Sequence, residues 1–217
     1  MKETFYHLDE DKRRRIEAAA LEEFGRYGYE RGSTDRIIRK SGISKGGLYE
    51  YISSKEDLFL HIVELAYGSL YDHIGSSLRM KGAVPSDLLE RFRAASASAL
   101  SFYLKNPSVV RLLASIARID DPDAKSRAEA IFGKRFLDLF GDADFSGLRF
   151  GPDRVLDLLR WMLIKTRNDF IAELERYEDG ADLPAEKISS AYLADWDFIL
   201  SVLSDGIYSQ RGKACLD

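Results

Sequence analysis

The sequence has little of what disulfide-stabilised, secreted and membrane proteins need. One cysteine, Cys215, stands near the end of the 217-residue chain, so no disulfide can form within it. No apolar run reaches the ~18 residues of a membrane-spanning helix, and the best candidate, residues 158–170, is interrupted by Arg160 and Lys165. The first 15 residues lack the apolar segment of a signal peptide. We therefore expect a cytoplasmic protein that does not enter a membrane.

Signatures of catalysis and metal binding are missing as well. His7, His61 and His73 lie apart and have no metal-ligand spacing. The acidic segments 120–123 and 141–144 lack the twelve-residue pattern of a calcium loop and indicate helix caps and turns. The chain contains neither a G-x-S-x-G motif nor a phosphate-binding loop. The sequence therefore predicts neither an enzyme nor a cofactor or metal.

The charge of the chain is unevenly distributed. The net charge is −4, which by itself argues against nucleic-acid binding. Residues 31–55, however, hold six basic and two acidic side chains, a net charge of +4, so the remainder carries −8. One short basic segment on an acidic body favours a nucleic-acid contact confined to that segment.

The hydrophobic pattern is helical in the first 80 residues. Apolar residues recur every three or four positions from Ile16 to Tyr27, which predicts an amphipathic helix that begins near residues 9–11 and is stopped by Gly28. Serines at N-cap positions begin three further helices: Ser33, Ser44 and Ser54. The last of these helices is expected to run from Lys55 to about Met80.

In the rest of the chain, the positions of the prolines indicate where helices begin. All five prolines lie beyond residue 80, and each begins an apolar-periodic segment, where its missing N–H is no loss. They predict helices near residues 86–104, 108–119, 123–140, 153–179 and 185–209. No segment shows sustained alternation of apolar and polar residues or a hairpin turn between β-branched runs. The sequence therefore predicts an all-α fold of about nine helices.

Two short helices joined by "SGIS" (residues 41–44) and preceded by a longer helix form the pattern of a helix-turn-helix. The second short helix begins with Gly46 and Gly47, although glycine disfavours a helix by about 1 kcal/mol relative to alanine. Because glycine places no side chain between the helix and a duplex, backbone N–H groups can approach phosphates or base edges. We expect this helix to enter the major groove.

Hydroxyl and ammonium groups surround that helix and supply donors for phosphates. The candidate DNA-binding residues are Ser33, Thr34, Ser44, Lys45, Gly46, Gly47, Tyr49, Tyr51 and Lys55. Taken singly, each serine can be only a helix cap, each tyrosine a half-buried aromatic and each lysine a solvated surface residue. The prediction therefore depends on their joint spacing, and such contacts fix register more than sequence specificity.

Residues 24–59, "FGRYGYERGSTDRIIRKSGISKGGLYEYISSKEDLF", resemble the N-terminal domain of the TetR family of transcriptional repressors. The shared features are Phe24, Gly28-Tyr29, Ser33-Thr34, Ile37, Gly42-Ile43-Ser44, Leu48-Tyr49, Tyr51, Lys55-Glu56 and Leu58-Phe59. Three positions depart from the family pattern: Ile38, Gly47 and Ile52. The resemblance implies DNA contact by Thr34, Ser44, Lys45, Gly46, Tyr49, Tyr51 and Lys55. It also implies a DNA-binding domain over residues 1–53.

The resemblance further implies that residues 54–217 form a helical domain that binds a small ligand and dimerises, with residues 54–80 as the connecting helix. An aromatic-rich pocket would suit an apolar or aromatic effector. Its candidate lining is Tyr67, Tyr71, Phe92, Phe102, Tyr103, Phe132, Phe136, Trp161 and Phe170. Candidates for a dimer interface come from the last two helices: Leu159, Met162, Tyr192, Trp196, Ile199 and Leu203. Any of these residues can instead fill a monomer core.

Together these features predict a homodimeric, ligand-responsive transcriptional regulator, most simply a repressor, that binds palindromic operator DNA. A dimer follows from function too, because one short helix buries little surface, whereas two helices about 34–36 Å apart read a palindrome. The alternative is an all-helical protein that binds small hydrophobic ligands and whose helix-turn-helix is purely structural. An enzyme in the helical domain is the weakest reading.

Overall fold

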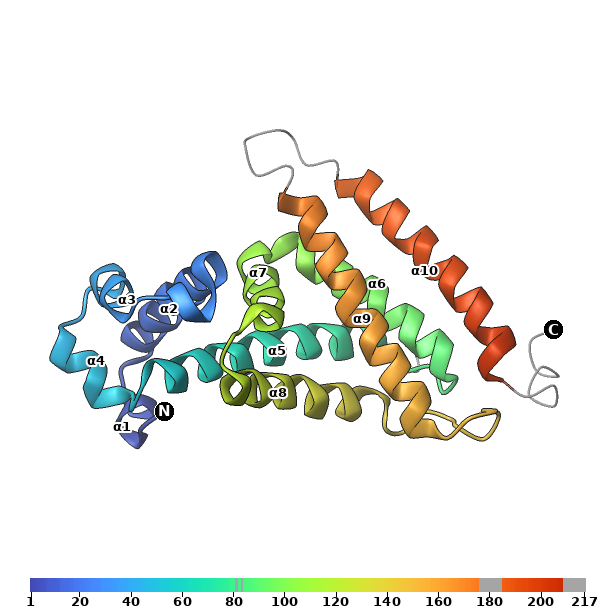
Figure 1. Ribbon diagram of the computed structural model, residues 1–217, viewed down its shortest axis with the longest axis horizontal. Coiled ribbons are helices and arrows are strands. Elements are labelled where there is room, and N and C mark those ends of the chain that lie inside the picture. The colour runs from blue at the N-terminus through green and yellow to red at the C-terminus, as the bar shows by residue number, and fades with distance from the viewer. Residues whose placement is uncertain (81, 83, 176–184, 209–217) are drawn as a thin grey trace. The chain divides into compact units, whose positions relative to one another are not determined.

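The computed structural model describes residues 1–80, 82, 84–175 and 185–208, and these residues form an all-α fold, as predicted (Figure 1). The helices are α1 Glu3–Tyr6, α2 Glu10–Arg31, α3 Thr34–Ser41, α4 Lys45–Tyr51, α5 Lys55–Met80, α6 Leu88–Lys105, α7 Pro107–Ser115, the 3₁₀ helix η1 Ile116–Arg118, α8 Pro122–Phe140, α9 Pro152–Glu175 and α10 Ala185–Ile207. The described part contains two isolated β-bridges and no strand. Lys81, Pro184, Cys215 and the predicted helix ends at 179 and 209 lie outside the described residues.

The chain divides into two compact units. Unit 1 comprises residues 1–69 and 106–135, and unit 2 comprises residues 70–105 and 136–217. Helices α5 and α8 each contribute to both units, so the units do not coincide with two consecutive stretches of the chain. No helix in the described part of the chain is long and apolar enough to span a bilayer.

Unit 1 is built around α2, which packs against α3 and α7. The approach to α7 needs a glycine, because a Cβ on Gly25 would lie 2.9 Å from the carbonyl oxygen of Ser108. At Gly28 the backbone leaves the helical conformation, with φ 71°, so the first long segment of α2 stops at the predicted glycine and a short segment continues beyond the kink to Arg31. The fully buried side chains of this unit include Ile16, Phe24, Ile37, Leu48 and Phe59.

Serine caps explain where the short helices begin. The hydroxyl of Ser44 accepts a hydrogen bond from Gly47 N at 3.0 Å, and that of Ser54 accepts one from Asp57 N at 3.0 Å. The carboxylate of Asp57 in turn accepts from the backbone N–H of Ser53. The two bonds to serine each satisfy an N–H that the first turn of a helix leaves without an intrahelical partner, and the bond to Asp57 fixes the residue that precedes the N-cap of α5.

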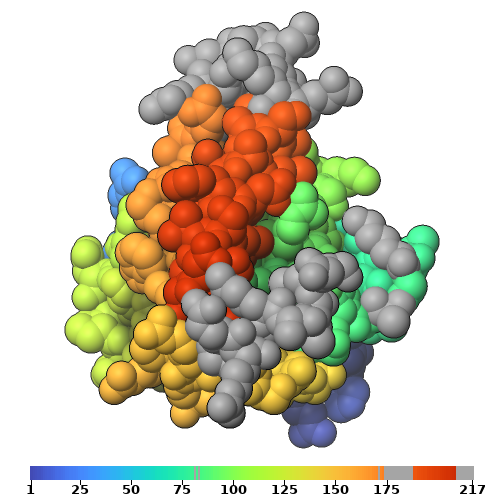
Figure 2. Space-filling model, turned by 90° about the vertical axis from the view of Figure 1, so that its right-hand side faces the viewer, coloured from blue at the N-terminus to red at the C-terminus, as the bar shows by residue number. Residues whose placement is uncertain are grey.

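Unit 2 has an aromatic core. The buried rings of Phe92 and Trp196 meet edge to face, with centroids 5.0 Å apart, which joins α6 to α10. The same two helices are tied at the surface by Arg93, whose guanidinium donates to both carboxylate oxygens of Asp197. This hydrogen bond lowers the pKa of the Asp197 carboxyl. Figure 2 shows the face of unit 2 on which α10 lies beside α9.

Candidate nucleic-acid interface

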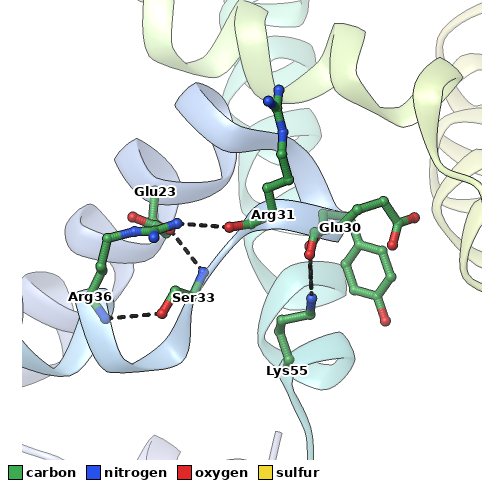
Figure 3. A network of polar contacts seen from close by, with 7 residues as sticks. Glu23, Glu30, Arg31, Ser33, Arg36 and Lys55 are labelled. Atoms are coloured by element: carbon green, nitrogen blue, oxygen red, sulfur yellow. Dashed lines mark hydrogen bonds and ion pairs between the residues drawn. The ribbon is translucent and has the colours of Figure 1, made fainter.

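A buried carboxylate fixes α3 against α2 (Figure 3). Glu23, 7% exposed, accepts from the backbone N–H of Ser33 at 2.8 Å and from the guanidinium of Arg36 at 2.6 and 2.8 Å. The hydrogen bond to Glu23 raises the pKa of Arg36, whose guanidinium also donates to the carbonyl oxygen of Arg31. The Ser33 hydroxyl accepts from Arg36 N, so this predicted DNA-binding residue acts as the N-cap of α3.

The turn between α3 and α4 is set by one left-handed residue. Gly42 has φ 70° and ψ 29°, and its N–H donates to the carbonyl oxygen of Ile38. Leu48 of α4 is fully buried, as is Ile37 of α3, so the two short helices share the unit 1 core. This arrangement is a helix-turn-helix in which α4 is the second helix, called here the recognition helix.

The first turn of the recognition helix is open. A Cβ added to Gly46 would meet no atom within 4 Å, so the fold itself does not require glycine at this position. At Gly47 a Cβ would lie 3.0 Å from the Ser44 hydroxyl, so this glycine makes room for the helix cap. Ser44, Lys45 and Gly46 are all exposed. The backbone at the start of the recognition helix can therefore be approached from outside at Gly46.

Three side chains carry donors beside this open turn. Lys45 is 70% exposed, and its ammonium lies 3.2 Å from the equally exposed carboxylate of Asp35. The hydroxyl of Thr34, at the start of α3, lies 3.3 Å from the phenolic oxygen of Tyr49, which is 41% exposed. The structure thus brings these donors, which come from both helices, to one exposed region.

Two of the predicted residues do not face outward in this way. Tyr51 is only 9% exposed, and its hydroxyl accepts a hydrogen bond from the ammonium of Lys12 at 3.0 Å. The ammonium of Lys55 donates to the carbonyl oxygens of Tyr29 and Glu30, at 2.9 and 3.2 Å. Since both groups already have partners within unit 1, we leave them out of the phosphate contacts proposed below, and for these two residues contact with phosphate stays a prediction.

One element was missed entirely by the sequence reasoning, which began the first helix at residues 9–11. The one-turn helix α1 lies within residues 1–7, called here the N-terminal arm, and packs on α4. The ammonium of Lys2 and the hydroxyl of Thr4, both in this arm, donate hydrogen bonds to backbone carbonyl oxygens of α4. A four-residue turn leaves no periodic pattern, and only the aromatic Phe5 gave a sign of burial.

The aromatic residues predicted to line a ligand pocket are divided between the two units. Tyr67 and Phe132 belong to unit 1, where their ring centroids lie 5.4 Å apart. Those in unit 2 are Tyr71, Phe92, Phe102, Tyr103, Phe136, Trp161 and Phe170. Trp161 is 64% exposed on α9, so the pocket prediction for this residue is not kept. A hollow of about 130 Å³ in unit 1 is lined by none of these aromatics and is smaller than a typical ligand pocket of about 300–1,000 Å³.

The residues predicted for a dimer interface also divide. Leu159, Met162 and Trp196 are buried within the chain, whereas the rest are half-buried: Tyr192, Ile199 and Leu203. Other apolar side chains of α9 and α10 are exposed instead: Leu158, Trp161, Phe198 and Val202. The two helices therefore bury half of the predicted residues and expose other apolar side chains.

Taken together, the fold and this geometry define a helical protein with an N-terminal helix-turn-helix whose second helix is exposed at its first turn. Residues 16–62 match the sequence model of bacterial regulatory proteins of the tetR family. The N-terminal domain is therefore a TetR-type domain, and the chain has the fold of TetR family transcriptional regulators.

Solved structures share this fold along most of the chain. A TetR family regulator from Chloroflexus aurantiacus is 22% identical, with 96% of this chain and 99% of that chain covered and a TM-score of 0.61. FadR from Bacillus subtilis, solved with stearoyl-CoA, is 14% identical, with 84% and 96% covered and a TM-score of 0.64. FadR of Bacillus halodurans, a regulator of fatty acid degradation, is 16% identical, with 83% and 97% covered and a TM-score of 0.62. A comparison with curated protein sequences finds no match.

Proposed function

We propose that the protein is a ligand-responsive transcriptional repressor that binds palindromic operator DNA as a homodimer in the cytoplasm. The observation that carries this proposal is the exposed first turn of the recognition helix, where Gly46 leaves the backbone uncovered. Thr34, Lys45 and Tyr49 stand beside it with hydroxyl and ammonium donors. The DNA-binding domain is residues 1–53, and its contacts to the duplex are made by Thr34, Ser44, Lys45, Gly46 and Tyr49.

The dimer part of the proposal is supported by the exposed apolar residues of the last two long helices. Trp161 on α9 and Phe198 on α10 are 64% and 68% exposed, and Val202 is 57% exposed. Large apolar side chains exposed on neighbouring helices are typical of a surface that another protein covers. A second copy of the chain is the partner that a palindromic operator requires, since each copy then supplies one recognition helix.

The effector is proposed to be a small apolar or aromatic molecule that binds within residues 54–217. The aromatic side chains concentrated in this region support an apolar ligand. The stearoyl-CoA held by B. subtilis FadR, whose fold is shared, makes long-chain acyl-CoA the first class to test. A coupling of about 1–3 kcal/mol between effector and DNA would weaken operator binding ~5–150-fold.

The test is a fluorescence-anisotropy titration of the full chain. Duplexes enriched from a random pool are labelled, and their dissociation constants are measured from low to moderate salt for wild type and Lys45→Ala. We expect an enriched palindrome, and for Lys45→Ala weaker binding to every duplex with a log–log salt slope shallower by about one. A wild-type protein that binds no duplex at low salt would refute the proposal and favour a helical ligand-binding protein.

A further inference from the structure

The N-terminal arm satisfies the C-terminal end of the recognition helix. Lys2 donates from its backbone N to the carbonyl oxygen of Tyr51 at 2.9 Å and from its ammonium to that of Tyr49 at 2.8 Å. Between these, the Thr4 hydroxyl donates to the carbonyl oxygen of Glu50 at 2.6 Å. The last four carbonyls of a helix have no intrahelical partner, and the arm supplies donors to three of them in succession.

One aromatic side chain anchors the arm in unit 1. Phe5 is fully buried, and its ring meets those of Tyr51 on α4 and His61 on α5 at centroid distances of 6.5 and 5.1 Å. The imidazole of His61 lies 3.0 Å from the carboxylate of Glu17 on α2. The arm is therefore held by α4 and α5, and the His61 ring that Phe5 contacts is in turn bound by α2, while the polar groups of the arm reach the end of the recognition helix.

The recognition helix needs such support. It has seven residues, two of them glycine, which is too few to be stable alone. Leu48 and Tyr51 are its buried side chains, and the remaining carbonyl of its last turn, that of Leu48, accepts from Ile52 N. Its order therefore depends on groups outside it, and at its C-terminal end the arm contributes most of them.

We infer that the N-terminal arm is a positioning element that keeps the recognition helix in its DNA-binding conformation, with Lys2 and Thr4 as positioning residues. This inference rests on the proposed function for its effect on DNA affinity. When only part of the population is competent to bind, the apparent affinity falls in proportion to that fraction. Loss of the arm therefore weakens binding to all duplexes without removing a phosphate contact.

The first test separates positioning from direct contact by salt dependence. Thr4→Val removes the hydroxyl donor at nearly constant shape, and we expect it to weaken duplex binding about fivefold, while Thr4→Ser retains wild-type affinity. Lys2→Met is expected to weaken binding with an unchanged log–log salt slope. A slope shallower by about one would make Lys2 a direct phosphate contact and overturn its assignment as a positioning residue.

The second test needs no DNA, so it decides the inference even if the proposed function fails. Amide hydrogen exchange is measured over residues 45–52 in the full-length wild type, Phe5→Ala and, as the matched control, Tyr6→Ala, whose side chain is 55% exposed. We expect exchange at least about tenfold faster in Phe5→Ala alone, with protection of α2 unchanged. Wild-type exchange over residues 45–52 in Phe5→Ala would overturn the inference.

Discussion

Replacing Gly46 by alanine is expected to stabilise the recognition helix and to weaken its binding to DNA. The added methyl group meets no atom within 4 Å, and the backbone at this position does not need a positive φ. Alanine is favoured over glycine in a helix interior by about 1 kcal/mol, and less near the end. Gly46→Ala is therefore expected to raise the melting temperature by up to ~2–4 °C, the shift that 1 kcal/mol gives in a chain of this size.

The same methyl group would stand between the helix backbone and the duplex. If main-chain N–H groups at this turn bind phosphate or base edges, a displacement by one methyl breaks at least one charge-assisted hydrogen bond, worth roughly 1.5–3 kcal/mol. We therefore expect Gly46→Ala to bind the operator at least ~10-fold more weakly while being at least as stable as wild type. Stability and affinity move in opposite directions only if glycine serves binding.

The assay compares Gly46→Ala with a matched helical glycine. Gly68 in α5 would place its Cβ 3.7 Å from Arg135, an ordinary contact, so Gly68→Ala should also stabilise but leave DNA affinity unchanged. Gly47→Ala would crowd the Ser44 hydroxyl at 3.0 Å and is expected to gain no stability. Thermal unfolding by circular dichroism and operator anisotropy are measured on all three. Wild-type affinity in Gly46→Ala would refute the reasoning about the open turn.

Further predictions concern the phenols, Lys55 and the exposed face of α10. Tyr49→Phe should weaken operator binding severalfold without loss of stability, whereas Tyr51→Phe, which removes the partner of Lys12, should lower the free energy of unfolding by about 1 kcal/mol in urea titrations. Lys55→Met should leave the salt slope of operator binding unchanged, and a shallower slope would restore Lys55 as a phosphate contact. Phe198→Asp should yield monomers in sedimentation equilibrium, and a dimer of wild-type affinity would exclude this face as the interface.

Local signals in the sequence were enough to predict most of the helices. Serine caps, a glycine turn and prolines at helix starts act within one turn of chain, so the beginning of α5 at Lys55 and the left-handed Gly42 follow from neighbouring residues. The position of Tyr51 could not be predicted in this way, because it is covered by Phe5, 46 positions earlier in the chain. A half-buried phenol and a buried one have the same sequence context.

The exposed apolar side chains of α9 and α10 could not be predicted from the sequence for a similar reason. Both helices carry apolar residues on more than one face, so their periodicity cannot say which face the rest of unit 2 covers. Trp196 is buried because its ring packs against Phe92 on α6. Phe198, two positions further along α10, then lies on the opposite side of the helix and is exposed. Tertiary neighbours, which periodicity does not report, select the exposed face.

The groups that stabilise the recognition helix lie away from the turn that is open to DNA. A helix that must present bare backbone to a duplex gives up side-chain contacts at its first turn, so its stability has to come from groups that a bound duplex would not displace. The Ser44 hydroxyl holds its N-terminal N–H groups, and Leu48 packs in the core. Lys2 and Thr4 hold its last carbonyls from the opposite end. The open turn and the N-terminal arm therefore follow from the same requirement, that the recognition helix presents its backbone to DNA. The first turn is left free for the duplex, so the C-terminal end must be held by residues outside the helix.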